Sequence, residues 1–345
     1  MTIIAADKAN LDHGFASGRP SSGGHRVVAA GQNLTQASLA HFTWARTAFK
    51  SGTAMIKQHD IETEAATQVT IITVCYNSSH ILSRMLNSIP AGTAVVLVDN
   101  ASADRSESRK LATRPNTRLV ELDQNIGFGQ ACNLGAGLAE TEFLLFLNPD
   151  VSLRPGALTA FVKAAHNNPG VVAMNPAIYR ENGRPYFKRG SVLLPKQQWL
   201  PRGGPGRDGH MPVLTGAALF VRRRNFIDIG GFDCRIFLYH EDDDLALRLA
   251  QHGTLMFVGA AVVDHIGGSS TEAAPSVAAL KGWHMGRSRV YAGRKHGVPA
   301  PFLRAFTQAS LQMMSPVILF SRRKRAKQWA FLRGVWSMKN TRWGS

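Results

Sequence analysis

The sequence predicts an α/β fold: a doubly wound, mostly parallel sheet followed by a basic, largely helical C-terminal appendage. Between residues 69 and 166, apolar runs typical of buried strands alternate with helical patterns, as in βαβ units. Polar residues follow directly after several of these runs, where ligands bind in parallel sheets. Residues 273–345 contain 14 Lys and Arg but no Asp or Glu, so most of the net charge of +17 lies near the C-terminus.

The expected strands and helices follow one another regularly as far as residue 176. Residues 69–75 form a near-continuous, β-branched apolar run, which is typical of a strand buried on both faces. Further strands are predicted at 94–98, 119–122 and 143–147, and helices at 79–89, 127–139 and 155–166, with Pro155 at the first helical position. Beyond residue 176 the alternation ends. We expect a long mobile loop over the Gly-, Pro- and Arg-rich residues 180–212, a strand over 213–221, a helix from Glu241 and a strand over 254–263.

The composition divides the chain into three parts. Residues 1–66 are rich in Gly, Ser, Ala and Thr without a sustained period, so we expect a poorly ordered extension. Met55 precedes the first well-patterned segment, which leaves open whether residues 1–54 belong to the native protein. An α/β domain is expected over 67–272 and a basic amphipathic helical tail over 273–345.

Targeting signals and cysteines indicate a cytoplasmic protein. No apolar run reaches the roughly 18–20 residues needed to cross a bilayer, and no secretory signal is visible. The three cysteines are far apart in the sequence and form neither a metal-binding spacing nor a disulfide framework, which favours a reducing compartment.

Four adjacent acids, Glu241 to Asp244, are the least common feature of the chain. Neighbouring carboxylates repel one another, and each raises the cost of ionising the next. One reading is a helix N-terminus, where acids favour the helix dipole and Asp244 pairs with Arg248 four residues later. The alternatives are a cation site and acid–base chemistry.

Polar residues also follow two other predicted strands. Asn148-Pro149-Asp150 ends the strand 143–147, and it fits either a turn or a divalent-cation site beside a diphosphate. His265 ends the strand 254–263 and precedes two glycines, so it is either a surface histidine or a ligand to a metal or a phosphate.

Taken together, these motifs resemble those of the family 2 glycosyltransferases, which have the A-type nucleotide-sugar-binding fold. The resemblance runs from about Val69 to Ser270, and it is greatest to the bacterial rhamnosyltransferases, whose cation motif reads Asn-Pro-Asp. The segments that carry it are Ile71-Ile-Thr-Val-Cys-Tyr-Asn, Val98-Asp-Asn-Ala-Ser, Asn125-Ile-Gly-Phe-Gly with Asn133, Leu147-Asn-Pro-Asp, Thr215-Gly-Ala-Ala, Gly230-Gly-Phe-Asp and Glu241-Asp-Asp-Asp-Leu-Ala-Leu-Arg.

The resemblance implies a role for each motif within a catalytic domain over 67–272. Asp242 is implied as the catalytic base, and Glu241 as the residue that orients it or touches the acceptor. Asp150, with Asn148, and His265 are implied to hold Mg²⁺ or Mn²⁺ on the donor diphosphate. The residues implied to bind the nucleotide sugar are Thr73, Tyr76, Asn77, Asp99, Asn100, Asn125, Gly127 and Asn148. The chain departs from the family pattern at Asn148, which replaces an acid, and at His240, which replaces an apolar aromatic residue.

The implied activity is inverting sugar transfer, with dTDP-L-rhamnose as the expected donor. The acceptor would be a saccharide or a polyprenyl-linked sugar in the synthesis of a cell-surface polysaccharide. Another family 2 hexosyl- or galactofuranosyltransferase is the alternative within the family. The alternatives from other classes are a metal-dependent nucleic-acid-binding protein or nuclease, which the nearly neutral body of the chain disfavours, and a catalytically idle relative.

The basic tail predicts an anionic partner. Residues 273–345 mix Lys and Arg with Trp and Phe, which suits helices that lie on an anionic membrane surface. We therefore expect a peripheral position on the inner face of the cytoplasmic membrane and no nucleic acid partner. A merely solvated surface and single-stranded nucleic acid are the alternatives.

Overall fold

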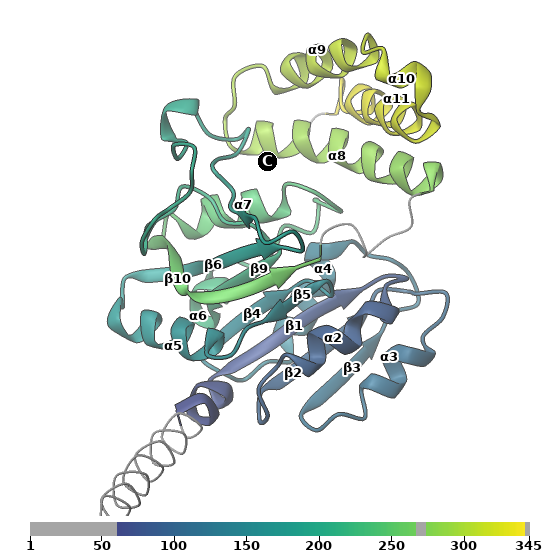
Figure 1. Ribbon diagram of the computed structural model, residues 1–345. Coiled ribbons are helices and arrows are strands. Elements are labelled where there is room, and N and C mark those ends of the chain that lie inside the picture. The colour runs from purple at the N-terminus through teal and green to yellow at the C-terminus, as the bar shows by residue number, and fades with distance from the viewer. Residues whose placement is uncertain (1–60, 267–273, 342–345) are drawn as a thin grey trace, which may run out of the picture. The chain divides into compact units, whose positions relative to one another are not determined.

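The computed structural model describes residues 61–266 and 274–341 and contains one ten-stranded sheet (Figure 1). Along the main path the strand order is β3-β2-β1-β4-β9-β6-β10-β5. The strands are β1 (Val69–Cys75), β2 (Ala94–Asp99), β3 (Thr117–Glu121), β4 (Phe143–Leu147), β5 (Val151–Leu153), β6 (Val171–Arg180), β7 (Pro185–Tyr186), β8 (Gly209–His210), β9 (Ala218–Arg222) and β10 (Thr254–His265). The predicted α/β class, a doubly wound sheet with a helical C-terminal region, is confirmed.

The sheet contains two groups of parallel strands, which are joined by an antiparallel strand. β1 pairs in parallel with β2 and β4, and β6 pairs in parallel with β10. β9 lies antiparallel between β4 and β6. As a result, β1, β4, β6 and β10 all point their carboxyl ends to the same edge of the sheet.

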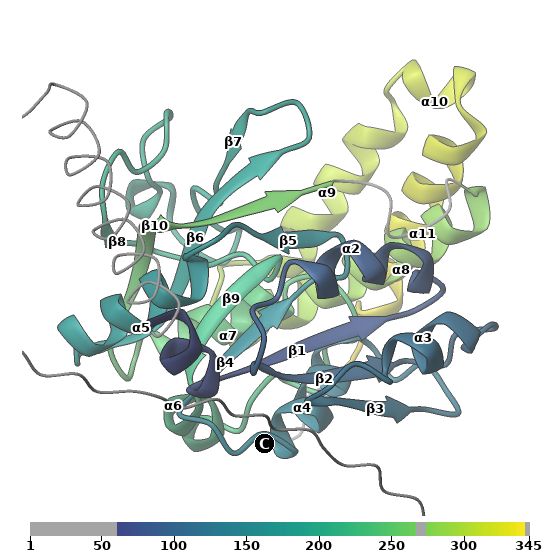
Figure 2. The same cartoon turned by 60° about the horizontal axis from the view of Figure 1, so that its bottom comes forward.

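Helices cover both faces of the sheet, as the alternating pattern predicts (Figure 1 and Figure 2). One face packs against α2 (Leu82–Asn87), α3 (Ser106–Leu111) and α5 (Ala157–Asn167), and the other against α4 (Phe128–Gly137), α6 (Arg223–Asp228) and α7 (Glu241–Leu249). All residues of β1 and β4 are buried. Phe161 of α5 stacks on Phe220 of β9 with 4.7 Å between ring centroids. The buried, continuously apolar strands are therefore the centre of the molecule.

Several elements differ from the sequence-based expectation, among them α5, β9 and β6. α5 begins at Ala157 rather than Pro155, because Gly156 takes a left-handed conformation with φ of 80°. The strand expected over 213–221 contains β9 only from Ala218 onward. β6 was not predicted at all. It contains Pro176, which has no N–H to donate, and the β10 register is irregular directly opposite this residue.

The C-terminal region forms helices α8 (Pro275–Lys295), α9 (Pro301–Met313), α10 (Val317–Phe320) and α11 (Arg322–Ser337). α8 is tied to the sheet domain by polar contacts, since the Ser288 hydroxyl donates to the Leu238 carbonyl at 2.9 Å and Tyr291 donates to Asp233 at 2.6 Å. No helix in the described residues is long and apolar enough to cross a membrane.

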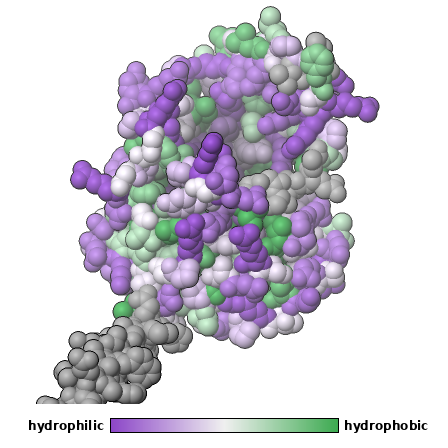
Figure 3. Space-filling model, in the orientation of Figure 1, coloured by the Kyte–Doolittle hydropathy of each residue, from purple (hydrophilic) through white to green (hydrophobic). Residues whose placement is uncertain are grey.

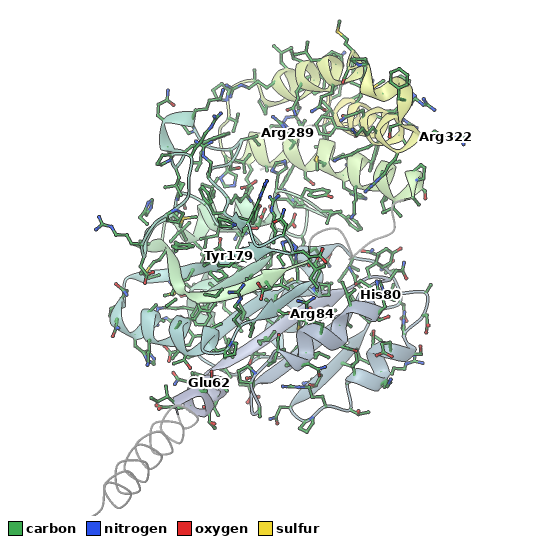
Figure 4. The ribbon with its side chains drawn as sticks, viewed as in Figure 1. Glu62, His80, Arg84, Tyr179, Arg289 and Arg322 are labelled. Atoms are coloured by element: carbon green, nitrogen blue, oxygen red, sulfur yellow. The ribbon has the colours of Figure 1, made fainter. Side chains whose placement is uncertain are left out.

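Most of the N-terminal extension expected over 1–66 lies outside the described residues. Residues 61–67 are helical, and Ala65 and Ala66 are buried. The Glu62 carboxylate (Figure 4) accepts a hydrogen bond of 2.7 Å from the Gly156 N–H, which links this helix to the start of α5. The division of the chain into three parts stays a prediction.

Candidate active site

A cleft of about 1000 Å³ opens at the edge of the sheet to which β4, β6 and β10 point their carboxyl ends. In Figure 3 this face is mostly hydrophilic and is hollowed below the C-terminal helices. Four predicted site residues line the cleft together: Asn148, Glu241, Asp242 and His265. Arg180 at the end of β6, Tyr186 and Thr215 also line it, and Lys281 reaches it from α8.

Asp242 is held in the cleft by contacts to both of its oxygens. Its Oδ2 accepts hydrogen bonds from the Lys188 ammonium at 2.7 Å and from the Gly216 N–H at 3.1 Å. Its Oδ1 accepts the Asp243 N–H at 2.8 Å. A side chain on Gly216 would come within 3.3 Å of Asp242, so a glycine there allows the close approach. The carboxylate is therefore fixed in position, while Oδ1 keeps a lone pair for another donor.

Glu241 lines the same cleft but lacks comparable partners. The residue is 9% exposed, and its Oε2 has no hydrogen-bond partner in the described part of the chain. Burial raises the pKa of the Glu241 carboxyl well above its ordinary value, and the neighbouring Asp242 charge raises it further. Glu241 is thus the acid of the run that most readily holds a proton.

Asp243 joins the acid run to the loop before it. Its Oδ1 pairs with Lys188 at 2.9 Å and its Oδ2 contacts the His240 ring at 2.9 Å. Burial alone would raise the pKa of Asp243, but the charge of Lys188 and the His240 hydrogen bond outweigh burial and lower it. Burial alone would likewise lower the pKa of Lys188, and the Asp242 and Asp243 charges reverse this effect and raise it.

The backbone entering α7 is strained. Tyr239 and His240 have φ of 68° and 67°, in the left-handed region that residues with a side chain seldom occupy. Each such residue costs on the order of 1–3 kcal/mol, and such strain gathers at functional sites. This conformation turns the chain so that the first residues of α7 face the cleft.

Asp244 is structural, and its predicted pairing with Arg248 is confirmed at 2.9 Å. The fully buried carboxylate also contacts Lys295 at 2.7 Å and His296 at 2.8 Å, at the end of α8. Burial alone would raise the pKa of Asp244, but the hydrogen bonds from His296 and Lys295 and the Arg248 charge lower it to about 2. Asp244 therefore connects α7 to the C-terminal helices.

The residues predicted to hold a cation lie next to each other. Antiparallel pairing of β10 with β5 brings His265 opposite Val151, and His265 Nε2 lies 3.4 Å from Asp150 Oδ1. This Oδ1 is buried and accepts no hydrogen bond from a described residue. A carboxylate and an imidazole beside a diphosphate suit Mg²⁺ or Mn²⁺. No cluster of three or more His, Cys, Asp or Glu that could hold a metal occurs within 61–266 and 274–341, so phosphates and water would complete the coordination.

Asn148 lines the cleft, whereas the other residues expected to bind the nucleotide sugar lie on or after β1, at the end of β2 and after β3, outside the cleft lining. The buried Asp99 accepts the Ser102 N–H at 2.7 Å and the Ser108 hydroxyl at 3.0 Å. Asn100 donates to Asn125 at 3.0 Å, and the Gly127 N–H donates to the same Asn125 oxygen at 3.0 Å. These four residues tie together the loops after β2 and β3.

The remaining three nucleotide residues are on or just after β1. The Thr73 hydroxyl is buried and has no hydrogen-bond partner among the described residues. Tyr76 is exposed, and Asn77 accepts the Ala103 N–H at 2.9 Å. Their role in nucleotide binding, like that of the other predicted site residues, stays a prediction.

Sequence reasoning missed three cations of the site. Lys188 lies in the segment that we expected only as a mobile loop, and Arg180 ends the unpredicted β6. Lys281 belongs to the basic tail, where nothing distinguishes it from its neighbours in the sequence. A count of charges near the acid run could not have found them, because they are far from it along the chain.

Comparison with known proteins identifies the family. Residues 70–230 match the model of glycosyl transferase family 2. The chain is 30% identical over 292 residues to the N-acetylglucosaminyl-diphospho-decaprenol L-rhamnosyltransferase of Mycobacterium tuberculosis (strain CDC 1551 / Oshkosh), covering 75% of this chain and 95% of that relative. It is 24% identical over 191 residues to the rhamnosyltransferase WbbL of Escherichia coli (strain K12), covering 46% of this chain and 72% of the relative.

The fold agrees with this family. The mannosyltransferase PcManGT from Pyrobaculum calidifontis, solved with GDP-Man and Mn²⁺, matches with a TM-score of 0.50 at 18% identity, covering 79% of this chain and 88% of the other. The fold and its cleft define the class, an A-type glycosyltransferase. The chain belongs to the family 2 glycosyltransferases, and its relatives include rhamnosyltransferases. The alternative of a nuclease is therefore dropped.

Proposed function

We propose that the chain transfers L-rhamnose from dTDP-L-rhamnose to a saccharide carried on a polyprenyl diphosphate, in the synthesis of a cell-surface polysaccharide. The name of the M. tuberculosis relative supports this sugar and this class of acceptor. One observation carries the proposal: the acids Glu241 and Asp242 share a cleft with His265, which lies beside Asp150. A candidate base and a candidate diphosphate site thus face one space.

In this proposal Asp242 removes the proton from the acceptor hydroxyl. A sugar hydroxyl is a weak nucleophile unless a carboxylate takes its proton during attack. The acceptor oxygen forms the new bond to the anomeric carbon as the bond to the nucleoside diphosphate breaks, and displacement from the opposite face inverts that carbon. Lys188 and the Gly216 N–H hold Asp242 in place. Glu241 faces the cleft beside it and contacts the acceptor.

Asp150 and His265, with Asn148 nearby, would hold a divalent cation against the donor diphosphate. Bound there, Mg²⁺ or Mn²⁺ would supply positive charge that stabilises the departing diphosphate. The nucleoside is proposed to lie over the ends of β1 and β2, at Thr73, Tyr76, Asn77, Asp99, Asn100, Asn125 and Gly127. The C-terminal helices are proposed to rest on the inner face of the cytoplasmic membrane.

The proposal is tested with purified full-length protein, a panel of nucleotide sugars and a polyprenyl-diphosphate-linked N-acetylglucosamine acceptor. We expect transfer from dTDP-L-rhamnose above all other donors, loss of transfer with EDTA and recovery with Mn²⁺ or Mg²⁺. Asp242→Asn should lower kcat by about 10²–10⁴-fold, the usual contribution of a general base, with little change in donor affinity.

Asp228→Asn is the matched control, because this half-exposed acid lies on α6, outside the cleft lining. If the protein prefers another nucleotide sugar, that sugar takes the place of rhamnose in the proposal, and the class of reaction stays the same. Full activity of Asp242→Asn would exclude it as the base.

A further inference from the structure

Three basic side chains gather where α8 and α11 pack together. Lys281 is on α8, and Arg323 and Lys327 are one turn apart on α11. The backbone of Gly282 packs directly against the backbone of Lys327, because no side chain at residue 282 separates the helices. Burial lowers the pKa of the Lys281 ammonium, and the charges of Arg323 and Lys327 lower it further. The three cations are therefore close enough to repel one another.

The C-terminal region supplies no acidic residue of its own beside this cluster. No Asp or Glu follows Glu272 in the sequence. Neither Arg323 nor Lys327 forms an ion pair with any residue of the described ranges. Positive charges gathered in this way, two of them without an ion-pair partner there, favour an anionic ligand.

The cluster connects the cleft to an exposed apolar tip. Lys281 lines the cleft. It is close enough to Asp150 that the charge of this carboxylate acts to raise the pKa of Lys281. At the other end, Phe320 of α10 precedes Arg323 by three residues and is 88% exposed, and the nearby Met314 is 79% exposed. Figure 3 shows hydrophobic residues along the outer edge of these helices. Acids, cations and apolar side chains therefore follow one another from the cleft outward.

We propose that Lys281, Arg323 and Lys327 bind the diphosphate of the lipid-linked acceptor, with its sugar in the cleft and its polyprenyl chain leaving past Phe320. This assignment rests on the proposed function and adds the residues that select the acceptor. From the cleft outward, the acids, the cations and the apolar side chains follow the same order as the sugar, the diphosphate and the polyprenyl chain of such a molecule. Guanidinium and ammonium groups are the usual partners of diphosphate oxygens.

The donor also carries a diphosphate, so the experiment must separate the two sources. Its readouts are the KM for dTDP-L-rhamnose and the KM for two acceptors with the same sugar, one linked through a polyprenyl diphosphate and one through an uncharged alkyl chain. The variants are Lys281→Ala and the double variant Arg323→Ala/Lys327→Ala. We expect the KM for the diphosphate acceptor to rise about tenfold or more, as for lost charge-assisted hydrogen bonds. The KM values for the donor and for the alkyl acceptor should stay within about twofold.

The control variant is Arg322→Ala/Arg333→Ala, which removes two charges from the same helix. At about 100° per residue, these two positions lie about 80–140° around the helix axis from Arg323 and Lys327, and Figure 4 shows Arg322 at the outer edge of the helices. The control should leave all three KM values unchanged. An equal effect of the control, or a raised donor KM in the test variants, would overturn the assignment.

Binding of farnesyl diphosphate, measured by calorimetry with farnesol for comparison, does not depend on turnover. We expect the wild type to bind the diphosphate and not the alcohol, and the test variants to bind it about tenfold more weakly. Weaker binding of farnesyl diphosphate by the variants would support the site. Failure of the protein to use any nucleotide-sugar donor would refute only the proposed function. Unchanged affinity of the test variants for farnesyl diphosphate would refute the site.

Discussion

At the scale of single residues, burial and partners give the four adjacent acids different properties. Asp244 is held by Arg248, Lys295 and the His296 ring and is structural, whereas Asp243 pairs with Lys188 and His240. Asp242 is positioned by two donors on one oxygen. Glu241 has an unpartnered buried oxygen and a raised pKa. Four like charges are tolerated here because the fold supplies cations to three of them from other elements.

The raised pKa of Glu241 predicts a pH-dependent stability. Because the folded-state pKa lies above the unfolded value of about 4.3, the folded protein binds the proton more tightly, and stability falls as pH rises through the interval between them. Glu241→Gln removes this dependence. Relative to the wild type, the free energy of unfolding of the variant should therefore rise by about 1 kcal/mol or more between pH 5 and pH 8.

Thermal unfolding of both proteins at several pH values measures this difference. Glu140→Gln, at an exposed position, should show no such gain. If the difference in stability between the wild type and Glu241→Gln is the same at pH 5 and at pH 8, the raised pKa of Glu241 is contradicted.

At the scale of elements, glycines allow α8 and α11 to approach closely. A side chain at Gly286 would meet the Phe331 carbonyl oxygen and come within 2.9 Å of the Val335 nitrogen. Gly334 of α11 likewise faces the backbone of Trp283. The two helices are therefore packed backbone to backbone, and this packing positions Lys281 beside Lys327.

We expect Gly286→Ala to destabilise the protein by about 1–3 kcal/mol, the usual cost of overpacking. Gly137→Ala on α4 is the matched control, because its new methyl group would meet no atom within 4 Å. That change should be neutral or stabilising by up to about 1 kcal/mol, from helix propensity alone. Urea unfolding measures both. Equal stability of the two variants would show that α8 and α11 are not closely packed.

At the scale of the whole molecule, charge and exposed apolar surface gather in the same region. Residues 273–345, which include the C-terminal helices, carry most of the net charge of +17. They also expose Leu311, Met314, Phe320, Trp329 and Trp336. Each basic residue gains about 1 kcal/mol near an anionic leaflet, so this region is suited to a membrane surface.

We predict that the full-length protein cosediments with phosphatidylglycerol vesicles and not with phosphatidylcholine vesicles. High salt should weaken this binding, because it screens exposed charges. Met314→Ser/Phe320→Ser should weaken it about tenfold or more through lost apolar contact, whereas Ile227→Ser, at an exposed position on α6, should not. Equal binding to both kinds of vesicle would contradict the prediction.

The fold class, several elements and the family could be predicted from the sequence. Continuous apolar runs specify β1 and β4 within their observed bounds, because strands buried on both faces need no polar positions. The Asp244–Arg248 pair followed from helix periodicity alone. These features depend on residues that are close together in the chain.

Tertiary structure alone decided which distant residues meet at the site. The pairing of β10 with β5 brings His265 to Asp150, and Lys188 reaches Asp242 across 54 positions of sequence. β6 was not predicted. It contains Pro176, which is disfavoured in a strand, yet the strand forms between β9 and β10 with an irregular register. Local sequence determines strands, helices and motifs because their interactions lie within a few residues. The contacts that position charges in the cleft depend on strand register and helix packing, which exist only in the folded chain.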